Sequence, residues 1–196
     1  MTTIAPSFSS LQRPAGRVGL ALLLLALCWA VIASPSQAQS GAVVQVIGPA
    51  APVPAGQPFV VTIAIANAQN LGAFEFEYHY NAAVAGATVN NIQIGSLLGS
   101  GGRTTGELRL ASAPGQPGVP LYGAYSYGAA AGPNGNGILA TVTMTAVAPG
   151  VSQLSLAGLK VTDVTGHERA VTTTAGSVTV TAASRQIYLP LLRRSS

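Results

Sequence analysis

The sequence predicts an all-β protein in which two sheets pack face to face as a β-sandwich. From Gly41 onward, short runs rich in Val, Ile and Thr recur between turns rich in Gly, Pro and Asn, a spacing typical of sandwiches. No stretch of this region has the periodicity of an amphipathic helix. The clearest alternation lies between Gln57 and Tyr80, and the rest of the predicted fold is built around it.

The stretch from Gln57 to Tyr80 is predicted to be a hairpin of two antiparallel strands joined by a polar turn at 67–70. One side of the first strand is wholly apolar, with Phe59, Val61, Ile63 and Ile65. One side of the second strand is aromatic, with Phe74, Phe76, Tyr78 and Tyr80. The other side of the second strand carries Ala73, Glu75, Glu77 and His79. Because alternate side chains point to opposite faces, we expect the aromatic side in the core and the polar side facing water or a partner.

The remaining strands follow from alternation and from turn residues at their ends. They are predicted at 43–47, 88–94, 107–110, 121–127, 138–147, 151–159 and 176–181, with a strand end and turn at 161–166. Segments 95–105 and 128–137 are predicted as loops because Gly and other small residues dominate them, and we expect the second loop to be flexible. Together with the hairpin, this makes eight or nine strands.

Residues 1–38 are predicted to be a signal peptide rather than part of the fold. Arg13 and Arg17 precede an apolar run at 18–32, and small residues up to Ala38 suit cleavage by signal peptidase. The alternative is a retained membrane anchor, but about fifteen apolar residues are few for a helix that spans a bilayer. We therefore expect an exported protein that is cleaved after Ala38 and meets a membrane only during export.

The predicted domain, residues 41–182, is nearly neutral. Outside the signal segment and the last two arginines, five acidic residues are balanced by five basic ones: Arg103, Arg109, Lys160 and Arg169 in the domain, and Arg185 just after it. No basic stripe is present to follow a phosphate backbone, so nucleic-acid binding is excluded. The single Cys, Cys28, lies in the signal segment, so the domain has no disulfide and no Cys metal site. Its length of about 140 residues suits one domain with its own core.

Residues 183–196 form a separate C-terminal tail in this interpretation. An apolar stretch at 187–192 is interrupted by Pro190 and followed by Arg193 and Arg194. It is too short to span a bilayer. A disordered tail and a sorting or surface-retention tag both remain open, and the second would hold the protein at the cell surface.

Several turns and strands occur in an order that resembles a known family, over residues 43–180. The motifs that carry the resemblance are the turn at 53–59, the strand at 71–81, and the segments 137–142, 148–150, 158–163 and 176–180, with Gly166. Their order and spacing resemble the cohesin domain, the β-sandwich receptor module of cellulosome-type assemblies. No single motif is diagnostic, because alternating strands and turn glycines recur in many sandwiches.

The resemblance implies a nine-stranded jelly roll, with a cohesin-like or carbohydrate-binding-domain-like architecture, that binds a dockerin-bearing partner. The partner carries the calcium and is often a polysaccharide-degrading enzyme, so this chain needs no cofactor. The implied contact strand is matched by residues 73–80, and two prominent contact positions fall on Ala73 and Glu75. There a methyl group replaces an amide, and the acid is one methylene longer. The candidate partner-binding residues are therefore Ala73, Glu75, Glu77 and His79.

The same polar row could in principle do chemistry. A carboxylate pair such as Glu75 and Glu77 serves glycoside hydrolysis only when the two groups flank the sugar, whereas neighbours on one strand share a side. The two acids and His79 are plausible metal ligands, but a solvated sheet face explains them more simply. We therefore predict no catalytic residue and no metal site.

Tyr125 and Tyr127 offer an alternative function because aromatic rings stack on sugar rings. They share one strand face, whereas Tyr122 points the other way. Core packing or protein contact is the competing interpretation of these tyrosines, since sugar platforms usually use Trp.

The expected function is a secreted, non-catalytic, cohesin-like module that docks a dockerin-type partner in an extracellular assembly linked to polysaccharide catabolism. Direct carbohydrate binding and a structural cell-surface role are the alternatives.

Overall fold

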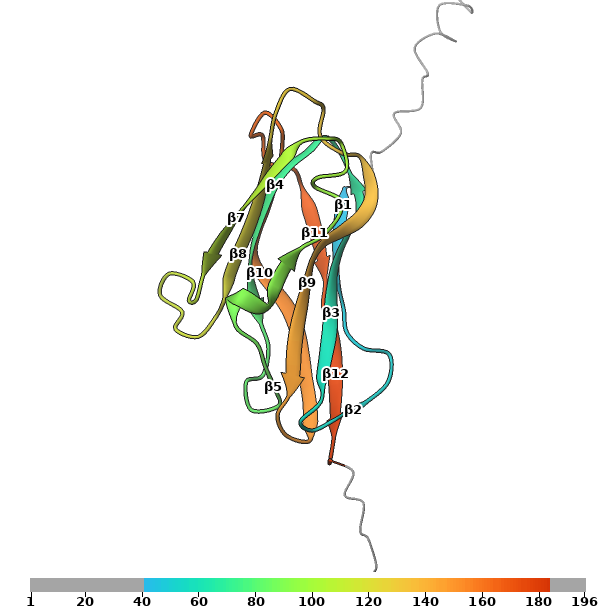
Figure 1. Cartoon of the computed structure of the whole chain (residues 1–196), viewed down its shortest axis with the longest axis vertical. Coiled ribbons are helices and arrows are strands. Elements are labelled where there is room, and N and C mark those ends of the chain that lie inside the picture. The colour runs from blue at the N-terminus through green and yellow to red at the C-terminus, as the bar shows by residue number, and fades with distance from the viewer. Residues whose placement is uncertain (1–40, 184–196) are drawn as a thin grey trace, which may run out of the picture. The chain divides into compact units, whose positions relative to one another are not determined.

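The computed structural model describes residues 41–183 of the chain. The predicted signal peptide, residues 1–38, and the predicted tail from residue 184 onward lie outside the described residues. The described part forms two sheets that face one another (Figure 1), which confirms the predicted all-β sandwich. Between residues 41 and 183, no helix is both long enough and apolar enough to cross a bilayer.

The first sheet has six strands in the order β11, β1, β3, β9 and β5, with β6 also paired to β9. Its strands are β1 (Ala42–Ile47), β3 (Pro58–Ala68), β5 (Ala85–Gly86), β6 (Ile92–Ile94), β9 (Gly135–Ala146) and β11 (Val171–Thr174). All of its pairs are antiparallel except that of β11 with β1.

The second sheet has six strands in the order β2, β12, β10, β4, β8 and β7. Its strands are β2 (Val53–Pro54), β4 (Leu71–His79), β7 (Thr104–Leu110), β8 (Leu121–Tyr127), β10 (Gly150–Asp163) and β12 (Gly176–Thr181). Only the pair of β12 with β2 is parallel. Nine of the twelve described strands have four or more residues, in agreement with the predicted number.

The core lies between the sheets and follows the predicted alternation. The predicted apolar side of β3 is buried throughout, and so are Phe74, Phe76 and Tyr78 of β4. The ring of Phe76 lies 6.1 Å from that of Phe74 and 5.7 Å from that of Tyr122 on β8. Burial of each such side chain contributes about 1.5–3 kcal/mol. The predicted inward faces of both strands are therefore confirmed.

The predicted hairpin is wrong, although both of its strands exist. β3 pairs with β1 and β9 in the first sheet, whereas β4 pairs with β10 and β8 in the second. The chain crosses between the sheets at 67–70, where Asn67 and Asn70 have φ angles of 58° and 48°. Their backbone N–H groups donate to the side-chain oxygens of Asn136 and Asn134. Two alternating strands can face one core from the same sheet or from opposite sheets, so alternation alone could not distinguish these arrangements.

Two further predicted elements differ from the structure. The strand predicted at 88–94 is reduced to β6, because Val89–Asn91 forms a 3₁₀ turn whose start is capped by the Thr88 N–H donating to Asn91 Oδ1 at 2.8 Å. The segments predicted at 151–159 and 161–166 join into the single strand β10. Gly158, with a φ of 56°, lies in a bulge that keeps the strand continuous.

The strand β11 was not predicted. It is short, and it pairs with β1, which lies far away in the sequence. The chain then passes from the first sheet to the second at Ala175, between β11 and β12. A strand of four residues shows too little side-chain alternation to be recognised in the sequence, and the strand that stabilises it lies far away in the chain.

The loop predicted at 128–137 is held in place at three positions. Arg103, which directly precedes β7, donates to the carbonyl oxygens of Gly128 at 2.7 Å and of Ala130. The backbone N–H of Gly132 donates to Asn70 Oδ1 at 2.8 Å, and β9 already begins at Gly135. These contacts give the loop a defined path over the end of the sandwich.

Candidate functional site

Four adjacent strands of the second sheet, β10, β4, β8 and β7, turn one set of side chains away from the core. On β4 these are the predicted partner-binding residues Ala73, Glu75, Glu77 and His79. Tyr125 of β8 lies directly opposite Ala73, and Tyr127 follows on the same side. We call this outward surface of the four strands the β4 face. The structure thus brings the predicted partner-binding residues and the predicted carbohydrate-binding tyrosines onto one surface.

Two glycines shape a hollow in the middle of the β4 face. Gly123 lies between Glu75 of β4 and Leu108 of β7, so no side chain fills the space between these neighbours. At Gly106 the ring of Tyr125 covers the backbone, because an added Cβ would lie only 2.4 Å from Cζ of Tyr125. The resulting hollow has a volume of about 280 Å³ and is lined by Ala73, Leu108 and Tyr125, with Glu75, Lys160 and Thr162 as polar neighbours.

Sequence reasoning missed this hollow. The available signal was Gly106 and Gly123 themselves, since an isolated glycine inside a strand marks a close approach or a missing side chain. Which side chains surround such a glycine depends on the strand register, and that register became visible only in the folded sheet.

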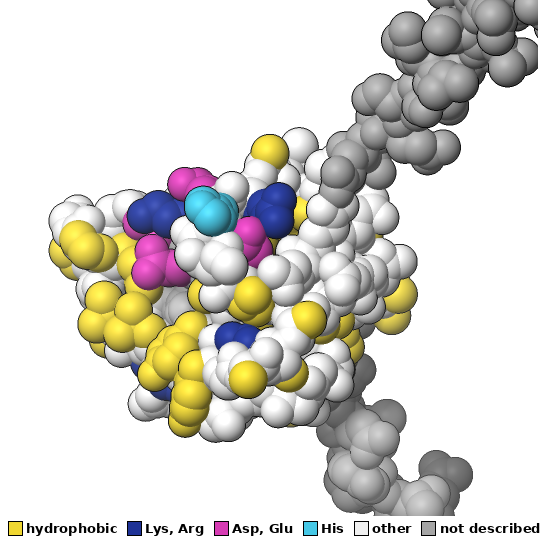
Figure 2. Space-filling view, turned by 90° about the horizontal axis from the view of Figure 1, so that it is seen from above, with side chains coloured by type: hydrophobic (Ala, Val, Ile, Leu, Met, Phe, Trp, Pro, Cys, Tyr) yellow, Lys and Arg dark blue, Asp and Glu magenta, His cyan; other side chains and the backbone are white. Residues whose placement is uncertain are grey.

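Four large apolar side chains are exposed around the hollow. Leu108 and Leu110 of β7 are 45% and 40% exposed, and Tyr125 and Tyr127 of β8 are 50% and 55% exposed. The two tyrosine rings lie 6.3 Å apart with an angle of 32° between their planes. Figure 2 shows hydrophobic side chains gathered on the side where β7 and β8 lie in Figure 1, next to a cluster of charged side chains. A contiguous apolar group of this kind is typical of an interaction surface.

Sequence reasoning also missed Leu108 and Leu110. Residues 107–110 alternate charged and apolar, but β7 is an edge strand whose charged side faces the sandwich interior. Glu107 and Arg109 therefore point inward and the two leucines point outward, the reverse of a usual amphipathic strand.

The inward charges form a polar cluster that closes the sandwich at β7. The hydroxyl of Tyr122 donates to Glu107 at 2.7 Å, and Arg109 donates to Glu107 as well. Arg109 also donates to the carbonyl oxygens of Val89, at 2.9 Å, and of Ile92. Burial, with the hydrogen bond to Glu107, raises the pKa of Tyr122. We call these three side chains, Glu107, Arg109 and Tyr122, the edge cluster.

The polar row along β4 divides into two halves. Glu77 accepts a hydrogen bond from the Gln116 side chain at 2.8 Å, and its carboxylate lies 3.4 Å from Nε2 of His79. The side chain of Glu77 is only 19% exposed as a result. Ala73 and Glu75 instead line the hollow. The half of the row that borders the hollow is therefore the half beside Tyr125.

The geometry of the β4 face does not suit hydrolysis of a sugar by a pair of carboxylates. Glu75 and Glu77 project from the same side of one strand and cannot flank a sugar from opposite sides. In the part of the chain that the structure describes, no group of three or more His, Cys, Asp or Glu side chains is placed to hold a metal ion. What the face offers a ligand is an apolar hollow with a carboxylate and an ammonium group at its rim.

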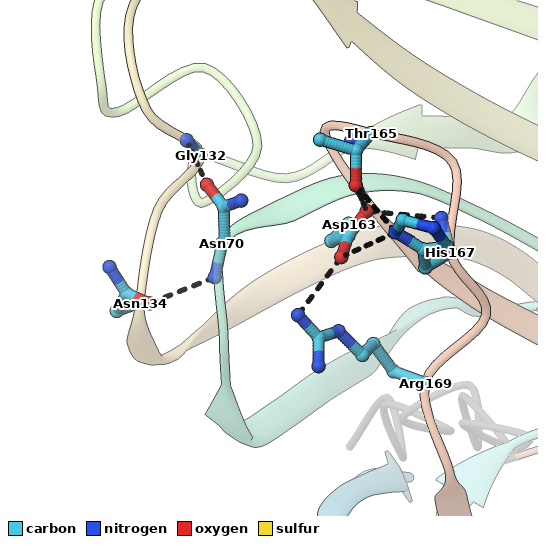
Figure 3. A network of polar contacts seen from close by, with 7 residues as sticks. All are labelled: Asn70, Gly132, Asn134, Asp163, Thr165, His167 and Arg169. Carbon is cyan, nitrogen blue, oxygen red and sulfur yellow. Dashed lines mark hydrogen bonds and ion pairs between the residues drawn. The ribbon is translucent and has the colours of Figure 1, made fainter.

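A second polar cluster orders the turn after β10 (Figure 3). Asp163 accepts hydrogen bonds from the Thr165 hydroxyl at 2.6 Å, from the backbone N–H of His167 at 3.0 Å and from Arg169 at 2.9 Å. These donors lower the pKa of Asp163 to about 2, and the Thr165 hydroxyl is the largest cause. The carboxylate satisfies local donors of the turn, so its role is structural.

No family model matches the sequence, and no curated protein matches it. Solved structures do match. A non-cellulosomal cohesin from the archaeon Archaeoglobus fulgidus superimposes with a TM-score of 0.57 at 19% identity, over 73% of this chain and 93% of that one. A type II cohesin domain from the cellulosome of Acetivibrio cellulolyticus gives a TM-score of 0.57 at 14% identity, over 70% and 95% of the two chains.

A third match is a chain from a type I cohesin–dockerin complex of Clostridium thermocellum. Its TM-score is 0.56 at 11% identity, over 74% of this chain and 97% of that chain. Identities this low establish likeness of fold. The described domain therefore has the fold of cohesin domains, and the resemblance found in its sequence is confirmed at that level.

Proposed function

We propose that the protein is a non-catalytic binding module whose β4 face docks a dockerin-type protein partner. The observation that carries this proposal is the hollow at Gly123 with its exposed apolar rim. Centres of protein interfaces are rich in aromatic and aliphatic side chains that fill pockets, and Tyr125 and Leu108 provide such walls here. The similarity to cohesins, one of them from a cohesin–dockerin complex, supports the same conclusion.

Docking at this face would combine apolar burial with charge steering. An apolar side chain of the partner enters the hollow and removes Leu108 and Tyr125 from water, which contributes about 25 cal/mol per Å² of buried apolar surface. Glu75 and Lys160, which lie opposite one another on β4 and β10, orient the partner and affect mainly the rate of association. The calcium ions belong to the partner in this proposal, and this chain needs no cofactor.

The test is a pull-down from the culture medium of the source organism with two matched variants. Ala73→Glu places a larger, charged side chain at the hollow, whereas Val60→Glu makes the same kind of change on the first sheet, where Val60 is 54% exposed. We expect Ala73→Glu to lose the captured protein and Val60→Glu to retain it. Capture by both variants, or by neither, contradicts a site on the β4 face.

A second candidate function is direct carbohydrate binding, and the adjacent exposed rings of Tyr125 and Tyr127 favour it. Affinity electrophoresis in neutral glycans separates the two functions. Retardation that disappears in Tyr125→Ala and Tyr127→Ala supports a sugar platform. An unretarded wild-type protein excludes that platform for the glycans used.

We also propose that the protein is exported, that it acts outside the cell or at its surface, and that its assembly serves polysaccharide catabolism. The pattern of residues 13–38 supports export. N-terminal sequencing of the protein recovered from the medium should give Gln39 as the first residue. Identification of the captured partner as a polysaccharide-degrading enzyme would support the catabolic role, and a partner of another class would overturn it.

A further inference from the structure

The second sheet ends at β7, and the outer edge of that strand is open. Among residues 41–183, β7 pairs only with β8. The other strands at sheet margins, β2, β5, β6 and β11, have two to four residues, whereas β7 has seven. In Figure 1, β7 lies at the left margin of the sandwich. A long open edge presents a row of backbone donors and acceptors that another strand can use.

The sequence of β7 selects strongly among incoming strands. Thr104–Leu110 contains no Pro and no Lys, the residues that commonly block an edge. Its inward charges, Glu107 and Arg109, oppose the addition of an arbitrary strand, because that strand would cover them without offering matching charges. Glu107 and Arg109 already bind one another within the edge cluster, so an occupant is favoured when its own inward side carries a base opposite Glu107 and an acid opposite Arg109.

We propose that the occupant is β7 of a second copy of this chain, paired antiparallel and centred on Leu108. In this register Leu108 lies opposite the second copy's Leu108 on the outward side. On the inward side Glu107 lies opposite the second copy's Arg109. By symmetry, Arg109 lies opposite the second copy's Glu107. Gly106 lies opposite the second copy's Leu110, and the Tyr125 ring that covers Gly106 becomes an apolar neighbour of that leucine.

Neighbouring registers are disfavoured by charge. Directly opposite residues of two antiparallel strands lie on the same face of a sheet. When the two strands are copies of β7, opposite residues must therefore be an even number of positions apart, and the two-fold axis passes through the residue midway between them. An axis through Glu107 places the two Glu107 side chains opposite one another, and an axis through Arg109 does the same with the two arginines. Like charges directly opposite destabilise the pair, so the register centred on Leu108 is preferred.

The proposed pairing reaches beyond the docking function and does not depend on it. A two-fold axis perpendicular to the sheet keeps both β4 faces on the same side of one continuous sheet. The exposed leucines of the two copies become neighbours, and the pair presents two hollows to the surroundings. Such an assembly would bind a partner with two docking modules more tightly than a single copy does.

The experiment measures the oligomeric state of the purified full chain by sedimentation velocity, with Leu108→Lys and Leu108→Glu as variants. Leu108 is half exposed and outward, so both variants should fold, which circular dichroism and the melting temperature check. We expect the wild type to be a dimer, each variant alone to be a monomer at the same concentration, and an equimolar mixture of the variants to be a dimer. The mixture recovers the dimer because unlike charges then meet on the axis.

The matched control is Val60→Lys and Val60→Glu on the first sheet, which should remain dimeric alone and mixed. Three results overturn the proposal. The first is a wild type that stays monomeric at about 100 μM, which is about 100 times a dissociation constant of about 1 μM. The others are single variants of Leu108 that remain dimers and a mixture of those variants that remains monomeric. Loss of partner capture in the preceding pull-down does not affect any of these outcomes.

Discussion

The two outer surfaces of the sandwich differ in charge. On the first sheet, β1, β3 and β9 contain no charged residue, and Thr62, Thr141 and Thr143 lie among the positions that alternate with the core. On the second sheet, the β4 face carries Glu75 and Lys160 beside exposed aromatic and aliphatic side chains. The first sheet packs on the same core without any outward charge. The charged and exposed aromatic side chains of the β4 face are therefore not needed for the fold.

Hollow size does not separate the two surfaces. The first sheet also has a groove, with a volume of about 320 Å³, lined by small or uncharged residues that include Val43, Gln45, Ala64 and Ile138. The hollow on the β4 face has a similar volume but adds an aromatic wall and a charged rim. Chemical character therefore marks the candidate site, because specific recognition needs polar groups placed around an apolar centre.

The largest effects should fall on the shared core and be the same for both sheets. Phe76→Ala in β4 and Ile63→Ala in β3 each remove a fully buried side chain. We expect losses of about 3–5 kcal/mol and about 2–5 kcal/mol in the free energy of unfolding, measured by urea denaturation. A large loss for one sheet and none for the other would show that the two sheets do not unfold as one unit.

A smaller effect should distinguish the second sheet from the first. Arg109→Ala removes the charged donor of the edge cluster and leaves the carbonyl oxygens of Val89 and Ile92 without that partner. We expect a loss of about 1–3 kcal/mol, the usual range for hydrogen bonds to a charged group. Thr143→Ala, on the outer surface of β9, is the control and should change stability by less than about 0.5 kcal/mol. Equal effects would mean that the edge cluster does not stabilise β7.

Low pH should destabilise the turn after β10, where Asp163 lies. It should have no such effect on the outer surface of the first sheet, which carries no charged side chain. The pKa of Asp163 is about 2 in the folded protein and 3.8 ordinarily. Its contribution to stability is therefore fully present above about pH 4 and is lost as the pH falls toward 2. Asp163→Asn should be less stable at neutral pH and should lose less stability over this pH range. Parallel unfolding curves for wild type and variant between pH 2 and pH 4 would contradict this assignment.

The smallest change in stability should come from the rim of the hollow. Glu75→Gln removes a partly exposed charge and should alter the free energy of unfolding by less than about 0.5 kcal/mol. It should nevertheless slow association with the captured partner and weaken the salt dependence of that rate, because charges at an interface rim act mainly by steering. Stopped-flow measurements at two salt concentrations give the result. The control is Thr62→Val on the first sheet. An equal change in the association rate of both variants would show that the charge that steers association is not Glu75.

Much of the candidate site could be predicted from the sequence. The outward row of Ala73, Glu75, Glu77 and His79 followed from alternation alone, and so did the shared face of Tyr125 and Tyr127. What could not be predicted is that β8 lies beside β4 with Tyr125 opposite Ala73. Strand neighbours are chosen by packing between distant segments, and no local pattern records that choice.

The sequence by itself determined most of the long strands and which of their side chains share a face, because side-chain alternation is a local property with a period of two residues. Tertiary structure alone decided that β3 and β4 belong to opposite sheets, and that Leu108 and Leu110 face outward. At the edge of the sandwich, Tyr122 and the carbonyl oxygens of Val89 and Ile92 bind Glu107 and Arg109, so the charged side of β7 turns inward. Those partners lie at least 15 residues away in the chain, and the orientation exists only once the two sheets have met.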